Sequence, residues 1–349
     1  SDVYKRQVTV FLRTHYPYSG TEEIMGTKLE RIAEISAETK KPVFTSIYHL
    51  INAELLKQCH KELDGKKAVG VDKVTKEEYG KNLDRNIEDL VQRLKNKSFK
   101  PLPSLRVYIP KGNGKMRPLG IASYEDKIVQ MAVKKVLEAI YEPRFLNCMY
   151  GFRPNRGCHE AVKEVYQRIS YGKISYIVDA DIKGFFDNVN HSKLIRQIWS
   201  LGIHDKTLIF IIKRILTAPI KMPDNTTVLP NKGTPQGGII SPLLANIVLN
   251  ELDWWIASQW EENPIAISRG RERIIGKTKV FDKSHGYRIM KNTEMKEMHI
   301  IRYADDFRIF CRTKEDAVRT KEAATAWIEE RLKLEVSPEK TRIVNTRKR

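Results

Sequence analysis

The chain has 349 residues, enough for about two domains of ordinary size, and 41% of them are hydrophobic. Lys and Arg number 62 against 43 Asp and Glu, a net charge of +19 that favours a polyanionic partner, because each cation that neutralises a phosphate releases a counterion. No apolar run is long enough to cross a bilayer and no secretory leader pattern opens the chain, so a membrane partner is not expected. The four cysteines form no CxxC pair, so neither a disulfide framework nor a structural zinc site is expected. We expect a reducing cytoplasmic compartment.

The first third of the chain is predicted to be helical. Residues 1–26 carry no periodicity, and we expect an arm or an expression remnant there. From 27 to about 99 the pattern is helical, as in 82–99, where apolar residues recur every three or four positions. A Gly-rich connector at 65–72 interrupts it.

A change of texture marks residues 101–121, which predict a β-hairpin with a Gly-Asn-Gly turn. A helix follows and ends near Pro143. Residues 174–181 are rich in β-branched and aromatic types and predict a strand, which Gly184 breaks before helical spacing resumes.

The second half alternates helices and strands irregularly, which indicates an α+β layer structure. A helix is predicted from Ser241, as N-cap, with Pro242 at its first position. The polar, basic stretch 261–298 has the character of an insertion. A hairpin at 300–310, a helix at 314–333 and a second hairpin at 332–344 complete the chain.

Two adjacent carboxylates, Asp305 and Asp306, occupy the tip of the hairpin at 300–310. Aspartate is common in turns, so a purely structural role is one interpretation. The other is that the flanking strands hold the two charges together and a divalent cation relieves their repulsion. A third carboxylate is then needed at the end of a neighbouring strand, and Asp179, Asp181 and Asp187 are the candidates, of which Asp181 is nearest the predicted strand end.

Basic side chains gather at two further places. Lys111, Lys115 and Arg117 lie on the glycine-turned loop, where Arg117 suits bidentate phosphate binding; an ordinary basic turn is the alternative. Arg153 and Arg156 stand beside aromatic residues, and basic side chains interleaved with aromatic ones suit the backbone and bases of a nucleic acid; a surface turn is the alternative.

Five blocks in order resemble those of bacterial group II intron-encoded proteins (maturases with reverse transcriptase), and the likeness runs from about 45 to 345. The blocks are "IPKGNGKMRPLGI" at 109–121, "YGFRPNRGCHEAV" at 150–162, "DIKGFFD" at 181–187, "GTPQGGIISPLLANI" at 233–247 and "YADD" at 303–306. The last three resemble polymerase motifs A, B and C. The extension containing "GKKAVGVDKVTKEEYGKNL" also resembles that family's block before the fingers.

The resemblance implies a right-hand polymerase with fingers and a palm, the palm being an antiparallel sheet backed by helices. We then expect an N-terminal extension and fingers at 27–120, interleaved fingers and palm at 121–175, and the palm at 176–349, with the insertion at about 261–298. The chain stops just after the last palm hairpin, so a thumb is not expected, and synthesis should be weak and poorly processive.

The resemblance also assigns the carboxylates. Asp181 and Asp305 become ligands of two Mg²⁺ ions, with Asp306 in support, and the reaction is two-metal nucleotidyl transfer. Lys111 and Arg117 would clamp the incoming triphosphate.

Further nucleotide contacts follow from motifs A and B. Phe185 and Phe186 read as core aromatics, but one of them, by register Phe186, resembles the steric gate that excludes a 2′-hydroxyl. Gln236 and Gly237 would approach the nucleotide closely, with a simple helix-entry turn as the alternative. Lys340 matches a proposed general acid for pyrophosphate, although an exposed hairpin lysine is the simpler interpretation.

The implied function is that of an RNA-directed DNA polymerase that also binds intron RNA to assist splicing and mobility. Its partners would be group II intron RNA, an RNA template with primer, and dNTPs, and dimerisation is not deducible. Arg269, Arg271 and Arg273 in the insertion are the expected RNA contacts, with a solvated loop as the alternative. Two other functions are an RNA-binding splicing cofactor with an unused palm and an RNA-dependent RNA polymerase, which the aromatic pair at 185–186 disfavours.

Overall fold

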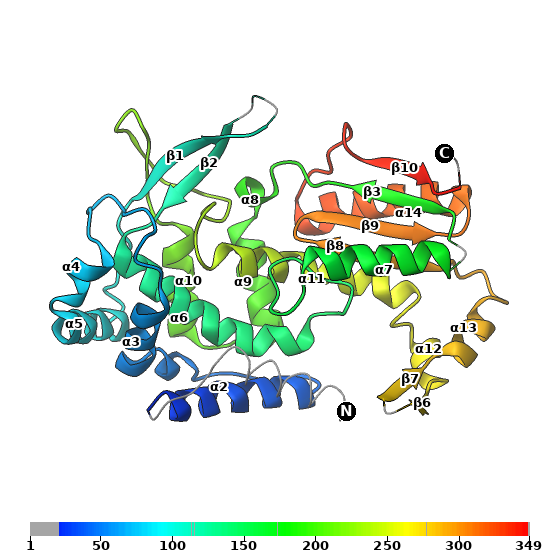
Figure 1. Ribbon diagram of the computed structural model, residues 1–349, viewed down its shortest axis with the longest axis horizontal. Helices are drawn as coiled ribbons and strands as arrows, with labels where there is room; N and C mark the ends of the chain where they lie inside the picture. Colours follow the sequence, from blue (N-terminus) through cyan, green and yellow to red (C-terminus); the bar gives the residue numbers. More distant parts are fainter. Residues whose placement is uncertain (1–20, 113, 115, 173, 277, 348–349) are drawn as a thin grey trace. The chain divides into compact units, whose positions relative to one another are not determined.

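Two compact units make up the chain in the computed structural model, which describes residues 21–112, 114, 116–172, 174–276 and 278–347 (Figure 1). Among the described residues, the sheet unit comprises 145–185 and 248–347, and the helical unit comprises 21–144 and 186–247. Each unit therefore takes two separate stretches of sequence, and each is described by itself. Among the described residues, no helix combines the length and apolar character that crossing a membrane requires.

Helices dominate the helical unit, as the periodicity predicts. They are α2 (Thr21–Glu38), α3 (Ala53–Glu62), α4 (Lys76–Gly80), α5 (Leu83–Lys95), α6 (Tyr124–Tyr141), α9 (His191–Ser200) and α10 (Lys206–Leu216), with short 3-10 turns η1 (Tyr48–Leu50) and η2 (Glu142–Arg144). Of the expected arm at 1–26, residues 1–20 lie outside the described residues, and residues 21–26 belong to α2, which begins at Thr21. In α5, Ile87, Leu90 and Leu94 are fully buried, so one face of the helix packs and the rest is solvated.

Helix α6 forms the centre of the helical unit. Ser123 caps it by accepting a hydrogen bond from the Asp126 N–H, and its residues are buried on nearly every side. Helices α2, α3 and α10 all pack against it. Because α6 is buried on nearly every side, it lies in the core of this unit and the other helices are arranged around it.

A four-stranded sheet in the order β2-β1-β4-β5 completes the helical unit. Strands β1 (Ser104–Pro110) and β2 (Met116–Ile121) form the predicted hairpin, and β4 (Ile220–Lys221) and β5 (Thr227–Val228) are short additions. Strand β1 is antiparallel to β2 and parallel to β4.

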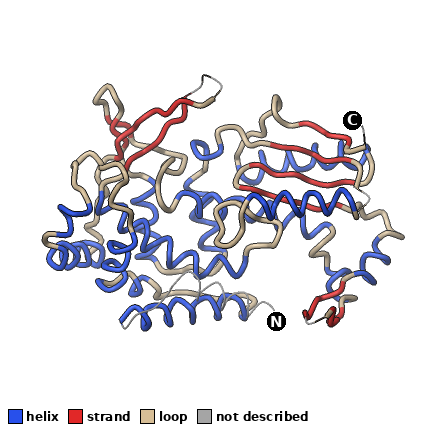
Figure 2. Tube along the Cα trace, viewed as in Figure 1, coloured by secondary structure: helices blue, strands red, loops and turns tan. Residues whose placement is uncertain are grey.

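The sheet unit is built on an antiparallel sheet in the order β10-β3-β9-β8 (Figure 2). Its strands are β3 (Tyr176–Ala180), β8 (Met298–Tyr303), β9 (Asp306–Cys311) and β10 (Arg342–Asn345). Helix α14 (Lys314–Trp327), continued by a turn of π-helix (Ile328–Leu332), packs against β3 and β9, and α7 (Cys158–Ser170) packs against β8. This antiparallel sheet with helical backing confirms the α+β expectation for the palm.

The junction between the units falls within α11 (Ser241–Gln259) and the short α8 (Phe185–Asn188). Helix α11 begins where the Ser-Pro signal predicts. The Ser241 hydroxyl donates to the Pro235 carbonyl oxygen at 2.6 Å, which fixes the loop before the helix.

The stretch 261–298 has secondary structure of its own. It contains α12 (Pro264–Ser268), a hairpin of β6 (Arg271–Ile275) and β7 (Thr278–Asp282), and α13 (Ser284–Met290). Trp260, Ala266 and Met290 form a small separate core there, and the Trp260 and Tyr287 rings stack at 5.7 Å. We call this segment the insertion.

The prediction of a second hairpin at 332–344 is wrong. Strand β10 pairs with β3, with Arg342 opposite Asp179, and Val336 bridges to Ile182. Both halves of the segment therefore pair with the same distant stretch of chain. Local apolar runs predict extended structure but not its partner, because pairing across the sheet is decided by non-local packing.

Candidate active site

The turn between β8 and β9 carries the adjacent carboxylates. Tyr303 pairs with Asp306, which leaves Ala304 and Asp305 as a two-residue connection. Ala304 has φ +58°, a left-handed conformation that a non-glycine residue adopts only when its surroundings impose it. Asp305 is partly buried and Asp306 is exposed. The turn thus carries two like charges at one end of the sheet.

A buried ion pair between Arg302 and Asp253 supports this turn. Arg302 and Asp253 are both completely buried and make two hydrogen bonds, Nε to Oδ1 at 2.8 Å and Nη2 to Oδ2 at 2.6 Å. Arg302 Nη1 also donates to the Ala304 carbonyl oxygen at 2.6 Å. The guanidinium therefore connects α11 to the backbone of the strained residue.

The segment 148–151 presses on the same turn. The Arg302 N–H donates to the Cys148 carbonyl oxygen at 2.8 Å, and the Tyr150 N–H donates to the Arg302 carbonyl oxygen at 2.9 Å, so this segment runs alongside β8. A Cβ on Gly151 would collide with the backbone nitrogen of Ala304. Glycine is needed here because two backbones approach closely.

Asp181 joins the pair from the end of β3. The Ser337 N–H donates to its carbonyl oxygen at 2.8 Å, and Ile182 bridges to Val336, so the residue is fixed immediately after the strand. Because β3 and β9 are neighbours in the sheet, the three carboxylates lie at one end of it and interact electrostatically.

The electrostatics of the three carboxylates follow from burial and mutual repulsion. Burial, and then the charge of Asp181, raise the pKa of Asp305. Asp306 is more exposed than Asp305, but partial loss of solvent around its carboxylate, followed by the charges of Asp305 and Asp181, still raises its pKa. The chain therefore holds negative charge here at a cost to the folded state, which a bound cation would offset.

Lys340 forms an ion pair with one of the three carboxylates. Its Nζ lies 2.8 Å from Asp181 Oδ2, and that hydrogen bond raises the pKa of the lysine. The side chain is 66% exposed, so the pair faces solvent and can exchange partners. Lys340 and the three aspartates are thus brought together.

The donor chemistry suits a hard divalent cation, because three carboxylates offer only oxygen ligands. Among the described residues, no group of three or more Asp, Glu, His or Cys side chains is arranged closely enough to hold a metal ion as it stands. Asp181 would have to exchange its contact with Lys340 for one with the cation. The residues fit such an ion chemically, and a change of side-chain conformation would complete the fit.

The two rival carboxylates lie elsewhere. Asp179 pairs across the sheet with Arg308 at 3.1 Å and with Arg342 at 3.6 Å. Asp187 belongs to the helical unit, where it lines a cavity of about 250 Å³ together with Arg106 and Gln236. Of the candidates in the sheet unit, Asp181 is thus the carboxylate that is grouped with Asp305.

The predicted triphosphate contacts lie on the β1–β2 hairpin of the helical unit. Lys111 and Arg117 are both exposed, and Arg117 pairs with Ile109 in the register of the hairpin. Lys115 lies outside the described residues.

The two phenylalanines after Gly184 differ in burial. Phe185 is 2% exposed and packs in the core, whereas Phe186 is partly exposed. The Phe186 carbonyl oxygen accepts a hydrogen bond from the Thr234 N–H at 2.7 Å, which ties it to the loop before α11. Phe186 therefore has surface available for a ligand.

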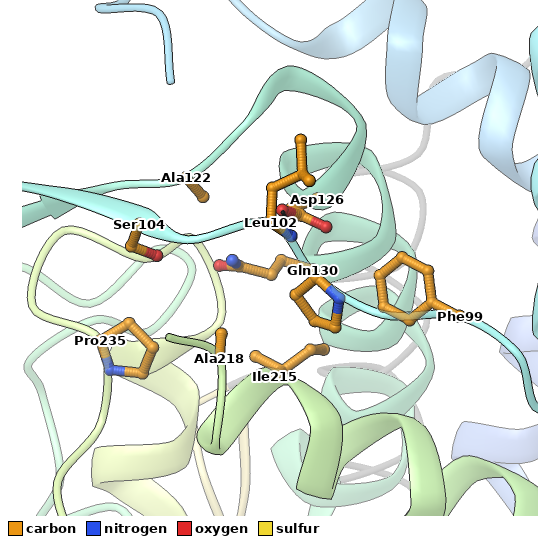
Figure 3. Close-up of a pocket in the computed structure, with 10 residues that line it drawn as sticks. Phe99, Leu102, Ser104, Ala122, Asp126, Gln130, Ile215, Ala218 and Pro235 are labelled. Carbon is orange, nitrogen blue, oxygen red and sulfur yellow. Dashed lines mark hydrogen bonds between the residues drawn. The ribbon is translucent and has the colours of Figure 1, made fainter. Parts of the chain in front are cut away.

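The loop 233–240 rests on α6 and β2. Gln236 accepts a backbone hydrogen bond from Gly120 at 2.5 Å, and Gly237 has φ +91°, a conformation that favours glycine. Gln130 Oε1 accepts from the Ile239 N–H at 3.0 Å. Figure 3 shows Gln130, Asp126 and Pro235 around a small cavity beside this loop. Sequence reasoning missed Gln130, whose burial on α6 gives it this positioning role.

The predicted template arginines bind their own loop. Arg153 Nη1 donates to the carbonyl oxygens of Leu146 at 2.8 Å and Met149 at 3.0 Å, and Arg156 donates to the backbone and side chain of Asn147. These bonds agree with the surface-turn alternative, and a template contact stays a prediction. In the insertion, Arg269 and Arg271 are exposed and Arg273 pairs with Asp282 at 2.9 Å.

A charged cluster that the sequence reasoning missed clamps both ends of the insertion. His299 Nδ1 lies 3.0 Å from Glu261 Oε1, and its Nε2 lies 3.2 Å from Glu297 Oε1. Arg168 pairs with Glu261 at 2.8 Å, and Arg312 pairs with Glu297. Burial alone would lower the pKa of His299, but its hydrogen bonds to the two glutamates raise it above the ordinary 6.5.

This cluster predicts a pH dependence of stability. A histidine with a raised pKa in the folded state contributes stability that is complete below its unfolded value and is lost as pH rises through the folded value. The thermal midpoint should therefore fall as pH is raised from about 6 to about 8.5, and His299→Gln should flatten this slope. The Arg168 guanidinium opposes protonation of His299, because its Nη1 lies 2.7 Å from His299 Nδ1. If His299→Gln melts with the same pH dependence as the parent chain, Arg168 keeps the imidazole neutral and the prediction is wrong. His49→Gln, at an exposed site, is the control.

Known proteins resemble this chain over most of its length. A family model of reverse transcriptases (RNA-dependent DNA polymerases) matches residues 109–349. The group II intron-encoded protein LtrA of Lactococcus lactis subsp. cremoris is 34% identical over 347 residues, which cover 91% of this chain and 57% of that protein. The Escherichia coli protein YkfC is 32% identical over 78% of this chain and 71% of its own length. An uncharacterised 91 kDa protein in a cob intron of Schizosaccharomyces pombe is 34% identical, and the match covers 74% of this chain and 34% of that protein.

Proposed function

Because the chain belongs to the reverse transcriptase (RNA-dependent DNA polymerase) family, we propose that it adds deoxynucleotides to a primer 3′-hydroxyl on an RNA template. The chain spans 57% of the length of the Lactococcus relative, and the proposal concerns the part present here. The observation that carries it is the grouping of Asp181, Asp305 and Asp306 at one end of an antiparallel sheet.

Asp181 and Asp305 would hold two Mg²⁺ ions, and Asp306 would support them through its charge. When bound, such ions lower the pKa of an attacking hydroxyl and stabilise charge on the leaving pyrophosphate. Lys340 would hold its proton at Nζ until the pyrophosphate leaves, which its raised pKa supports. Its ion pair with Asp181 must open first, and the exposure of the lysine supports this.

The incoming nucleotide would be bound by side chains of the helical unit. Lys111 and Arg117 would contact its phosphates, since both are exposed at the end of the hairpin. Gln236 and Gly237 would approach it through their backbone, and Phe186 would pack against the sugar. The burial of Phe185 supports Phe186 as the gate.

A second role is binding of group II intron RNA in splicing and mobility, by similarity to the Lactococcus intron-encoded protein. The net charge of +19 supports a polyanionic partner. Arg269 and Arg271 are the proposed contacts because both are exposed. Arg153 and Arg156 would contact RNA only after breaking their hydrogen bonds within the loop. An RNA-binding protein without polymerase activity is the other candidate.

Single-nucleotide addition tests the proposal. On poly(rA) with an oligo(dT) primer and Mg²⁺, we expect addition of dTTP and almost none of UTP. Phe186→Val should raise UTP addition by about tenfold or more, because the space beside the sugar then admits a 2′-hydroxyl. Equal use of both nucleotides by the parent chain would contradict the gate. Failure of a folded chain to add even one nucleotide would leave only the RNA-binding candidate.

A further inference from the structure

A groove between α9 and α10 lies outside every site described above. Its volume is about 500 Å³, and all of its lining residues belong to the helical unit. It shares none of them with the cavity that Gln236 lines. We call it the α9–α10 groove.

The floor of the groove is apolar and aromatic. Ile195, Trp199, Ile209 and Phe210 line it, and Trp199 is 41% exposed. The core of the two helices consists mainly of other residues, namely Leu194 and Ile198 on α9 and Leu208, Ile211, Ile212, Ile215 and Leu216 on α10, and of the groove residues only Ile209 is buried with them. The aromatic floor is therefore apolar surface beyond what packing these helices requires.

Both aromatic rings are held in place. The Trp199 ring stacks on His204 with centroids 4.4 Å apart, and His204 Nε2 lies 3.1 Å from the Trp199 carbonyl oxygen. The Arg214 guanidinium lies over the Phe210 ring at 5.1 Å. A fixed, half-exposed aromatic face loses little conformational entropy when a planar ligand stacks on it.

The rim of the groove is positively charged throughout. Arg196, Lys206 and Lys213 line it, all are exposed, and none has a carboxylate partner among the described residues. The adjacent Asp205 cannot neutralise them, because it is 5% exposed and its oxygens accept backbone hydrogen bonds from Ile47, Tyr48, Thr207 and Leu208.

We propose that the α9–α10 groove binds single-stranded RNA, with an unpaired base stacked on Trp199 and the flanking phosphates at Arg196, Lys206 and Lys213. Stacking on an aromatic floor beside a basic rim is how single strands are bound. A duplex keeps its bases stacked inside and would leave the floor uncovered. A protein partner would need an acidic rim around an apolar plug, whereas one strand of RNA supplies both base and charge along its length. The proposal does not rest on the polymerase chemistry.

Equilibrium binding of a fluorescent dodecamer of uridine to the whole chain tests this. Trp199→Ala should weaken binding by about 5- to 100-fold with an unchanged salt slope, because stacking is lost and no phosphate contact is. Lys206→Gln/Lys213→Gln should make the slope of log K against log salt shallower by about 1.4, the value for two phosphates of a single strand. Trp199→Phe should keep most of the affinity.

Matched variants separate this result from general effects. Trp254 is 43% exposed on α11, and Trp254→Ala should bind RNA like the parent chain. Binding is measured without primer or nucleotide, so failure of the polymerase proposal would leave this one standing. A dodecamer with 5-iodouridine should crosslink to Trp199 on irradiation. If Trp199→Ala and the double lysine variant keep the parent thermal midpoint, affinity and salt slope, the groove is not an RNA site.

Discussion

Asp305→Asn is expected to reduce single-nucleotide addition on the order of 1,000-fold while leaving RNA affinity unchanged. Asparagine keeps the size and shape of the side chain and removes the negative charge that would hold a divalent cation. A metal in such a site contributes several kcal/mol of transition-state stabilisation, and each 1.4 kcal/mol is about tenfold in rate. Primer extension with a single dNTP, followed over time, measures the loss.

The same substitution should stabilise the fold near neutral pH. Burial and the charge of Asp181 raise the pKa of Asp305, so its ionised form costs stability. A carboxyl whose pKa is raised in the folded state lowers the stability of the protein as pH rises from the unfolded-state pKa of about 3.9 through the folded-state pKa. Asp305→Asn should therefore melt at a higher temperature at pH 7, and the difference should shrink as the pH is lowered toward 4.

Two comparisons make the test specific. Mg²⁺ should raise the thermal midpoint of the parent chain and should raise that of Asp305→Asn less, which reports cation binding without any reaction. Asp179→Asn, on the same strand as the site but paired with Arg308 and Arg342, should retain activity. Full activity in Asp305→Asn, or its loss in Asp179→Asn alone, would contradict the assignment of the carboxylates.

Local patterns were sufficient to predict most elements and the turn that carries the two carboxylates. Runs of apolar and β-branched residues on both sides of an Asp-Asp tip predicted strands β8 and β9, and the spacing of Ile87, Leu90 and Leu94 predicted α5 with its buried face. These features depend on residues close together in the chain. The grouping of Asp181 with Asp305 needed the family resemblance, because spacing left Asp179 and Asp187 open.

What failed was non-local. The segment 332–344 carries a strand signal, but its pairing with β3 and Ile182 is decided by the whole sheet. The template contacts of Arg153 and Arg156 stay a prediction, and the basic-aromatic pattern did not reveal that the donors of these arginines bind carbonyl groups nearby in the chain. Buried charges were also passed over, although Arg302 and Asp253 stand within apolar segments, where a charge requires a partner.

Asp253→Leu is expected to lower the free energy of unfolding by about 3–5 kcal/mol. The substitution leaves the Arg302 guanidinium completely buried without its carboxylate, and an uncompensated buried charge is costly. Arg302→Met should cost a similar amount for the converse reason. The double variant should lose less than the sum of the two, because it replaces a buried pair by apolar side chains. Urea denaturation followed by circular dichroism gives all three values.

A second ion pair on the same helix is the control for this prediction. Glu251 lies 3.5 Å from Arg331, which is 63% exposed, so Glu251→Gln should cost less than about 1 kcal/mol. The buried pair has a further duty, since Arg302 Nη1 holds the carbonyl oxygen of Ala304 beside Asp305. Asp253→Leu molecules that remain folded should therefore also add nucleotides more slowly. If Asp253→Leu costs no more than Glu251→Gln and leaves nucleotide addition unchanged, the conformation of the turn comes from Gly151 and the strand pairing alone.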